Sequence, residues 1–305
     1  MGWLIEPGFF ASAQVHTALV IGAAAALVSA VVGVFTVIRG QSFGGHALTD
    51  ASATGGSGSL LAGVNPLLGF VVGAVTAAGA MEAIGVRHAR GRDLATGIVL
   101  GASIGLASLF LYLDTTATAT TGATQQILFG SIFAPAPGTV SIVAGFGAAS
   151  LAIILALYRP LLLTSISGDL AAARGVPVRL VGLAYMLALA LAVALSSLAI
   201  GAILSTALLI GPPATALHAT RRAGRALIGA AGLGIACTWI GVLLAYDSAH
   251  WFSDGNGLPV SFFIVAVIFL AYLISDLTTH RATRRSTAAG RTGALVGDRD
   301  PRAAR

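Results

Sequence analysis

The sequence predicts an all-α, polytopic membrane protein with about nine transmembrane helices. Of its 305 residues, 56% are hydrophobic and only 9% are charged, whereas a soluble domain carries roughly 25% charged residues. The mean hydropathy is +0.91. Runs such as HTALVIGAAAALVSAVVGVFTVI and PVSFFIVAVIFLAYLIS approach the roughly 20 residues that a membrane-spanning helix needs.

Nine apolar segments follow one another along the chain. The second is rich in Gly, Ser and Thr, so we expect it to face protein or water instead of lipid, because small residues let helices approach closely. The sixth and seventh are joined by a very short link. The predicted spanning helices lie near residues 14–37, 46–63, 65–85, 95–113, 138–158, 178–197, 199–217, 225–246 and 258–276.

The basic residues indicate how these helices are oriented. The chain has no Lys, and its Arg residues fall in the gaps after the first, third, fifth, seventh and ninth segments. Threading the segments alternately places every Arg on one side, which the positive-inside rule makes the cytoplasm. The N-terminus is then outside and the C-terminus inside. The net charge of +6 therefore predicts a partner bilayer and no nucleic acid.

Other parts of the chain do not span. Residues 115–138 are too polar to cross a bilayer and too apolar for a plain loop, which favours a re-entrant segment or a short interfacial helix at the outer mouth. Residues 164–180 form a short amphipathic stretch on the cytoplasmic side. We expect a transmembrane permease domain over 1–276, followed by an Arg-rich cytoplasmic tail over 277–305 whose composition predicts disorder.

Two ionisable residues stand at the start of the second segment, in GGHALTDAS. His46 and Asp50 are four residues apart, so they share one face of a helix. Ionisable groups inside the membrane are costly and usually face a bundle interior or a water-filled path. Imidazole and carboxylate together suit Zn²⁺, Mn²⁺ or Fe²⁺, and two donors make the weak site that transport requires. A purely structural role, hydrogen bonding at the helix start, stays open from the residues alone.

Five stretches, in order over about residues 20–275, resemble the bacterial permeases of zinc, manganese and iron ABC transporters. The first resembles the opening of those proteins, a G-V-F-x-V-x-R stretch followed by a G-D-x-L-x-H-A motif. Where that motif has Asp and then His four residues later, this chain has His46 and then Asp50. The exchange moves each donor by about one turn (roughly 5–6 Å) and leaves the metal preference open. The five stretches are VVGVFTVIRGQSFGGHALTDASATGG, GRDLATGIVLG, QQILFGSI, SGDLAAARGVPV and AIGAILSTALLIGPPATA.

The resemblance assigns a role to the SGDLAAARGVPV loop. It implies a cytoplasmic protrusion on which an ATP-binding subunit acts, with Asp169, Leu170, Arg174 and Gly175 as the coupling residues. Helix capping explains Asp169 and Arg174 equally well, because acids favour a helix start and bases a helix end.

A further predicted feature lies in LLIGPPATA. Gly211, Pro212 and Pro213 interrupt an apolar run, and a proline pair removes two backbone donors. Such breaks are tolerated where protein or a cavity satisfies the freed carbonyls. The three residues either line a transport pathway or bend a packed helix.

The resemblance implies a membrane-spanning permease subunit of an ATP-driven ABC importer for a divalent transition metal, Zn, Mn or Fe, working by alternating access in the bacterial cytoplasmic (inner) membrane. The chain itself would not be an enzyme, since the sequence has no Walker motif and a partner would hydrolyse ATP. Expected partners are a second copy, ABC ATP-binding subunits and an extracytoplasmic metal-binding receptor. No permanently bound cofactor is expected beyond the transported ion.

Two alternatives remain from the sequence. One is a gradient-driven secondary transporter or channel in which His46 and Asp50 relay protons. The other is an ABC permease for a chelated metal or a vitamin, in which the same two residues are structural.

Because the lone Cys237 has no partner within the chain, an intramolecular disulfide is excluded.

Overall fold

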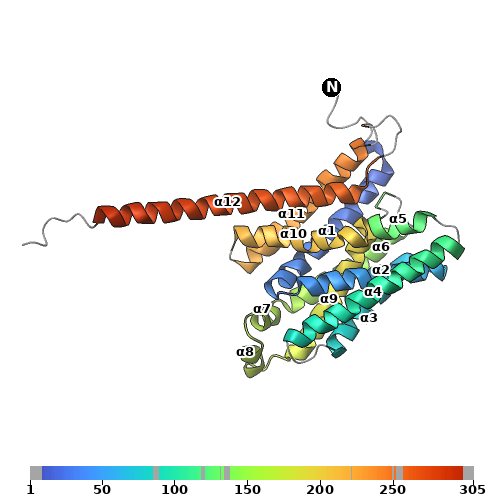
Figure 1. The fold of residues 1–305 in the computed structure, drawn as a ribbon, viewed down its shortest axis with the longest axis horizontal. Coiled ribbons are helices and arrows are strands. Elements are labelled where there is room, and N and C mark those ends of the chain that lie inside the picture. Colours follow the sequence, from blue (N-terminus) through green and yellow to red (C-terminus); the bar gives the residue numbers. More distant parts are fainter. Residues whose placement is uncertain are drawn as a thin grey trace, which may run out of the picture.

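The computed structural model describes residues 9–84, 89–117, 121–130, 132–133, 138–220, 222–248, 251 and 257–297. Every regular element among them is helical, which confirms the all-α prediction (Figure 1). The elements are the 3₁₀ helix η1 (Phe9–Ala11) and the α-helices α1 (Ala13–Ile38), α2 (Ser42–Leu61), α3 (Pro66–Ile84), α4 (Ala89–Ala117), α5 (Thr121–Phe129), α6 (Thr139–Ala156), α7 (Tyr158–Ile166), α8 (Gly168–Ala173), α9 (Val178–Ile200), α10 (Ala202–Ala219), α11 (Ala223–Ser248) and α12 (Val260–Gly297).

Among the described residues, seven helices are long and apolar enough to cross a membrane: α1, α3, α4, α6, α9, α11 and α12. The polytopic membrane class is thereby confirmed. The two other predicted segments correspond to α2 and α10. Helix α2 is long enough to span a membrane, but the stretch ASATGGSGS lowers its mean hydropathy. It is therefore not among the seven apolar helices.

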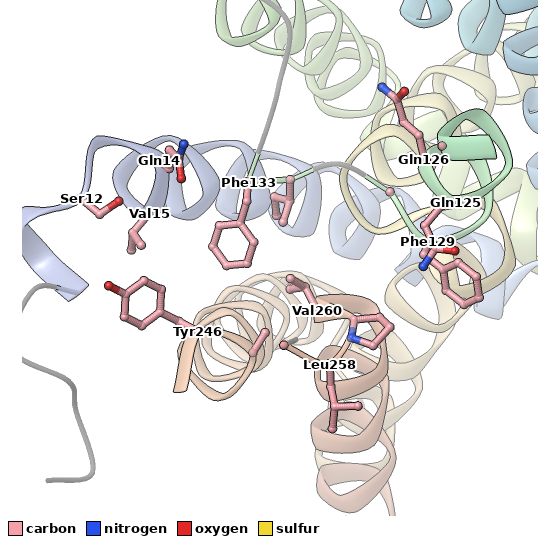
Figure 2. A pocket seen from close by; sticks show the side chains of 16 residues that line it. Ser12, Gln14, Val15, Gln125, Gln126, Phe129, Phe133, Tyr246, Leu258 and Val260 are labelled. Carbon is pink, nitrogen blue, oxygen red and sulfur yellow. The ribbon is translucent and has the colours of Figure 1, made fainter. Parts of the chain in front are cut away.

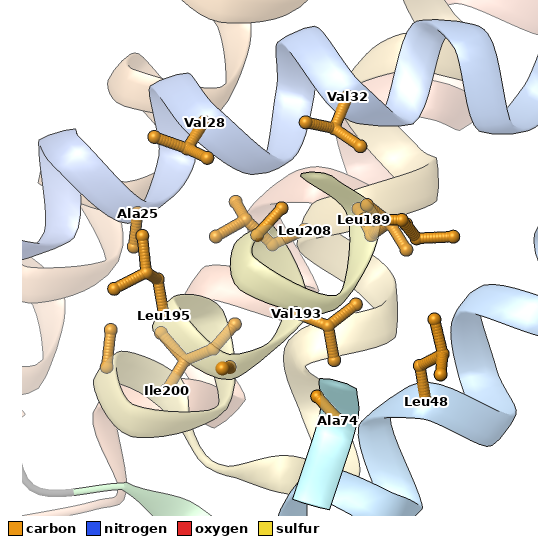
Figure 3. Close-up of a cluster of buried hydrophobic side chains, with 14 of the residues drawn as sticks. Ala25, Val28, Val32, Leu48, Ala74, Leu189, Val193, Leu195, Ile200 and Leu208 are labelled. Carbon is orange, nitrogen blue, oxygen red and sulfur yellow. The ribbon is translucent and has the colours of Figure 1, made fainter. Parts of the chain in front are cut away.

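The core forms around α1 and α9, the two most enclosed of these helices. Figure 3 shows Val28 and Val32 of α1 facing Leu195 and Leu189 of α9, with Leu208 of α10 beside them. All five side chains are almost completely buried. The centre of the bundle is therefore held together by close packing of small and branched apolar side chains.

Helix α2 is packed inside the bundle. It contacts α3, α4, α5, α9 and α10, so it faces protein instead of lipid, as its composition predicted. The contact with α3 is a glycine seam: a Cβ on Gly55 would collide with the Gly69 carbonyl oxygen, and a Cβ on Gly73 with the Ala51 carbonyl oxygen. Ser52 Oγ also donates to the Phe70 carbonyl oxygen at 3.1 Å. These backbone-close contacts hold α2 at a fixed depth.

The segment predicted to be re-entrant or interfacial contains the short helix α5. It contacts α2, α4, α9 and α10, and Ile127 is fully buried, so α5 packs into the bundle. Its end meets the one-residue link between α9 and α10. Gly201 there has φ +86, which favours glycine, and a Cβ on it would collide with the Leu128 carbonyl oxygen.

Helices α7 and α8 and the turn after them form the α7–α8 hairpin (residues 158–177). Ser167 caps α8 by accepting a hydrogen bond from the Leu170 backbone N–H at 3.2 Å. Gly175 ends it with φ +77, the left-handed conformation that commonly stops a helix. Figure 1 shows the hairpin at one end of the bundle and α5 at the other.

The C-terminal region differs from its prediction of disorder after residue 276. Its backbone continues α12 as helix through Gly297, and Figure 1 shows this part extending beyond the other helices. Residues 277–297 contain four Ala and four Arg, which are good helix formers, beside five Thr and three Gly, which are weaker ones. A helix that already exists also extends without a new nucleation cost. Residues 298–305 lie outside the described residues.

Candidate metal-binding site

The structure places His46 and Asp50 one turn apart on the first half of α2. His46 Nε2 lies 3.8 Å from Asp50 Oδ2, and the two side chains are 43% and 19% exposed. Most other side chains of α2 are buried in the bundle. His46 and Asp50 are partly exposed and therefore point out of it. A group that bound both residues would approach from the open side of α2.

The two donors lie near the separation that a shared metal ion would require. Two ligands about 2.1 Å from one ion lie about 3.0 Å apart at an octahedral angle and about 3.4 Å apart at a tetrahedral angle. The separation of 3.8 Å between His46 Nε2 and Asp50 Oδ2 exceeds the tetrahedral distance by roughly 0.4 Å, a gap that side-chain rotation can close. It is also too long for a direct hydrogen bond, so in this geometry the two side chains do not satisfy each other.

The second nitrogen of His46 has its own partner. Nδ1 lies 3.1 Å from Oγ1 of Thr206 on α10. Metal-binding histidines usually donate their other ring N–H to a neighbouring oxygen, which fixes the ring and its tautomer. With the proton on Nδ1 donated to Thr206, the lone pair of Nε2 is free and directed toward Asp50.

Sequence reasoning missed Thr206. The signal for it is the hydroxyl pair Ser205–Thr206 within the otherwise apolar run AILSTALLIG. Nothing in the sequence, however, says that Thr206 meets a residue 160 positions away.

A chain of buried hydroxyls fixes α2 behind the site. Ser197 Oγ of α9 donates to Ser205 Oγ of α10 at 3.3 Å, and Ser205 Oγ lies 3.3 Å from Thr49 Oγ1 of α2. All three side chains are fully or almost fully buried. On the next turn, Thr54 Oγ1 donates to the Ser103 carbonyl oxygen of α4 at 2.7 Å. Hydrogen bonds to α10 and α4, together with the Ser52 bond to α3, thus set the rotation of α2 and aim His46 and Asp50.

His46 and Asp50 are not part of a larger cluster of metal-binding side chains in the part of the chain that the structure describes, where no group of three or more His, Cys, Asp or Glu comes together. The pair supplies two donors. A tetrahedral or octahedral ion would need four to six, so the pair would hold an ion only together with further donors.

The four predicted coupling residues lie together on the α7–α8 hairpin, far from this pair along the fold. Asp169 lies in the first turn of α8, Arg174 directly follows its last residue, and both are exposed. Leu170 is 44% exposed and its neighbour Ile166 is 80% exposed. The hairpin thus carries an apolar surface edged by charges, at the end of the bundle opposite α5 (Figure 1).

The proline pair does not end its helix, because α10 runs from Ala202 to Ala219 through Pro212 and Pro213. Both prolines are buried. A Cβ on Gly33 of α1 would collide with the Leu209 carbonyl oxygen, which is the acceptor that Pro213 leaves without its usual donor. Gly211 packs against Ile268 of α12. These contacts show that this part of α10 is packed against α1 and α12, and whether the three residues also border a pathway stays a prediction.

Two cavities lie at opposite ends of the fold. The larger, of about 810 Å³, opens among α1, α5, α11 and α12, where Figure 2 shows Gln14, Gln126 and Tyr246 among its lining side chains. The smaller, of about 260 Å³, lies under the start of α2 and includes Phe43 and Gly44. The second therefore begins one turn from His46.

Replacing Thr206 with Val is expected to weaken Mn²⁺ binding by about 10- to 100-fold, the usual cost of losing a partner that orients a metal ligand. Val keeps the shape of Thr but removes the acceptor for His46 Nδ1. Calorimetry on the purified protein in detergent measures the affinity. Thr215→Val is the matched control, because that hydroxyl donates to the Gly211 carbonyl oxygen within α10. Equal affinity in Thr206→Val and Thr215→Val would contradict the assignment.

Several known proteins are similar in sequence to this chain over most of its length. The model of the ABC 3 transport family matches residues 12–276. The manganese import system permease protein ScaB of Streptococcus pneumoniae is 30% identical over 232 residues, which is 76% of this chain and 81% of that protein. The manganese transport system membrane protein MntC of Halalkalibacterium halodurans is 30% identical over 225 residues, 73% of this chain and 76% of that protein.

The fold agrees with a solved structure, PsaBC from Streptococcus pneumoniae in complex with Fab. The TM-score is 0.74 at 27% identity, with 88% of this chain and 92% of that chain covered. Such permeases are membrane subunits and not enzymes, and the seven apolar helices make this chain a multi-pass protein of the bacterial cytoplasmic membrane. The resemblance carried by its motifs is confirmed: the chain belongs to the ABC 3 transport family.

Proposed function

We propose that this chain is the membrane-spanning permease subunit of an ATP-driven importer for a divalent transition metal ion, with Mn²⁺ as the first of Zn²⁺, Mn²⁺ and Fe²⁺ to test. The pair of His46 and Asp50, 3.8 Å apart and open on one side of α2, carries the proposal. The printed names of the relatives, manganese import and transport proteins, support the choice of ion. Family membership does not favour the gradient-driven alternative.

We infer nine membrane crossings, with α2 and α10 added to the seven apolar helices. The N-terminus is then outside and the C-terminus inside. Arg39 at the end of α1, Arg159 and Arg179 around the α7–α8 hairpin, and Arg225 in α11 all lie on the side that this threading makes cytoplasmic. The family match to residues 12–276 supports a permease domain that ends where the Arg-rich tail begins.

Two copies of the chain would complete the metal site. Each copy brings one imidazole and one carboxylate on the open side of α2, and two such pairs supply the four donors that a tetrahedral ion needs. Because the ligands would be divided between two protomers, a shift of one protomer against the other would open the site. Such an opening releases the ion without covalent chemistry in this chain.

The α7–α8 hairpin is the proposed contact for the ATP-binding subunit. Leu170 and Ile166 expose apolar surface there, outside the membrane-spanning segments, and Asp169 and Arg174 flank it. The wider cavity at the opposite end is where an extracytoplasmic metal-binding receptor would deliver the ion. ATP hydrolysis in the partner would then drive alternating access between these two ends.

Uptake of ⁵⁴Mn²⁺ in a bacterial strain lacking its own manganese importers tests the proposal. The chain is expressed with the ATP-binding and receptor proteins encoded beside it, and with an ATP-binding subunit whose catalytic Glu is replaced as the control. We expect accumulation that depends on ATP hydrolysis and is competed by unlabelled Mn²⁺. Uptake that persists with the inactive ATPase would support a gradient-driven transporter instead. A chelated metal taken up in place of the free ion would support the chelate alternative.

A further inference from the structure

The turn between α1 and α2 places a charged side chain close to the proposed metal helix. Arg39 is the first residue after α1, and its backbone N–H donates to the Phe35 carbonyl oxygen at 2.9 Å. Gly40 turns the chain with φ +64, and α2 begins at Ser42. The Gln41 N–H donates back to the Thr36 carbonyl oxygen at 2.9 Å. This short, hydrogen-bonded turn makes the position of Arg39 and the start of α2 depend on each other.

The guanidinium of Arg39 reaches two other helices. Its Nη1 donates to Thr164 Oγ1 of α7 at 2.9 Å. Its Cζ lies 4.9 Å from the ring centroid of Tyr185 on α9, a cation–π distance. Tyr185 is fully buried, and its hydroxyl donates to Thr36 Oγ1 of α1 at 2.9 Å. The ring is a fixed support, so the guanidinium is held between a rigid core and the α7–α8 hairpin.

Thr164 belongs to that hairpin. It lies on α7, three residues before Ser167, which caps α8. The start of α7 also rests on α1, where the rings of Tyr158 and Phe35 meet edge to face at 5.9 Å. A displacement of α8 therefore reaches the end of α1 through α7, and the charged contact in this connection is the one between Thr164 and Arg39.

The opposite side of Arg39 borders the cavity of about 260 Å³. Arg39, Phe43 and Gly44 line it together with Glu82 of α3 and Asp93 of α4. Free volume beside the first turn of α2 lets that turn move, whereas the glycine seam to α3 holds the second half of the same helix. The first half, with His46 and Asp50, is joined to α10 by side-chain hydrogen bonds of 3.1 and 3.3 Å, which lengthen more easily than backbone-close contacts, so it is the part of α2 that a moving Arg39 can tilt.

We propose that Arg39 is a positioning residue that links the ATPase-facing hairpin to the metal helix, through its hydrogen bond to Thr164 and its stacking on Tyr185. The link rests on the proposed function. When α8 is displaced by the ATP-binding subunit, Thr164 draws the guanidinium along the Tyr185 ring. The turn at Gly40 passes this motion to the first half of α2, where His46 and Asp50 separate from the ion.

Proteoliposomes containing the permease with its ATP-binding subunit, and supplied with the metal-binding receptor protein, test the link, with Mn²⁺ uptake and ATP hydrolysis measured in the same vesicles. Arg39→Gln should lower the uptake per ATP hydrolysed by about tenfold, since a charge-assisted hydrogen bond and a cation–π contact are both lost. Thr164→Val, which removes the same bond from the other end, should lower it in the same direction. Arg39→Lys keeps the charge and a donor and should restore most of the ratio.

Ser165→Ala is the matched control, because it removes the hydroxyl next to Thr164 on the same helix, whose bond to the Leu161 carbonyl oxygen stays within α7. Its uptake per ATP should stay at the wild-type value. Mn²⁺ affinity measured in detergent should not change in Arg39→Gln, because His46 and Asp50 are intact. Thr164→Val keeps the test decisive if Arg39→Gln does not insert into the membrane.

The possible results of these uptake and hydrolysis measurements distinguish a failure of the Arg39 link from a failure of the proposed function. Wild-type vesicles that take up no Mn²⁺ with ATP would refute the proposed function itself. Normal wild-type uptake together with a wild-type ratio in Arg39→Gln, or in Thr164→Val, would overturn the link alone. Parallel loss of hydrolysis and uptake in an assembled Arg39→Gln complex would overturn it too, because the residue would then serve ATPase docking and not transmission.

Discussion

Replacing either His46 or Asp50 with Ala is expected to lower Mn²⁺ uptake by about 100-fold or more. Partners that only orient a metal ligand are worth about 10- to 100-fold in affinity, and each of these variants removes a ligand itself. In the proposed dimer a single substitution removes that donor from both copies. His46 and Asp50 supply one nitrogen and one oxygen donor from one face of α2. When either residue is replaced by Ala, only the other donor remains.

Radioactive metal uptake in importer-deficient cells measures this effect, with membrane levels of each variant matched by immunoblot. His218→Ala is the control, because His218 lies at the far end of α10 and contacts Tyr272 of α12. Its uptake should equal that of the wild type. If His46→Ala and Asp50→Ala both accumulate Mn²⁺, Zn²⁺ and Fe²⁺ at the wild-type rate, the pair is structural and the proposed site is wrong.

The exchanged order of the two donors belongs to the same experiment. The double variant His46→Asp with Asp50→His restores the Asp-then-His order of the family motif. It keeps both ligand types on one helical face, so it should retain uptake that the single Ala variants lose. Competition among the three ions would show whether the order also sets the metal preference.

Replacing Leu170 with Asp is expected to abolish ATP-driven uptake by uncoupling the two subunits. Leu170 is 44% exposed on α8, at the apolar surface proposed to meet the ATP-binding subunit. A carboxylate buried in that interface without a partner costs several kcal/mol, enough to reduce binding by about 100-fold or more. Co-purification of the ATP-binding subunit and uptake in proteoliposomes measure the two consequences.

The metal site itself is untouched in this variant, so Mn²⁺ binding by the purified permease should be unchanged. Val64→Asp is the control: Val64 is 50% exposed, but it lies between α2 and α3 at the other end of the fold. That variant should co-purify with its ATP-binding subunit as the wild type does. If Leu170→Asp also co-purifies and transports normally, the α7–α8 hairpin is not the coupling surface.

Several features were predictable because they depend on residues close together in the sequence. Hydropathy located the long helices, and the low hydropathy of residues 46–63 correctly placed α2 inside the bundle. The i, i+4 spacing of His46 and Asp50 put both on one helical face.

The sequence by itself determined the membrane class and the family and predicted the two candidate metal ligands, because hydropathy, motif order and helical periodicity are local properties of the chain. Only the tertiary structure decided which oxygen orients His46 and which residue joins the hairpin to α2. Thr206 lies 160 positions from His46, and Thr164 lies 125 positions from Arg39. Such partners depend on how helices rotate and pack against one another, and backbone-close glycine contacts set that packing.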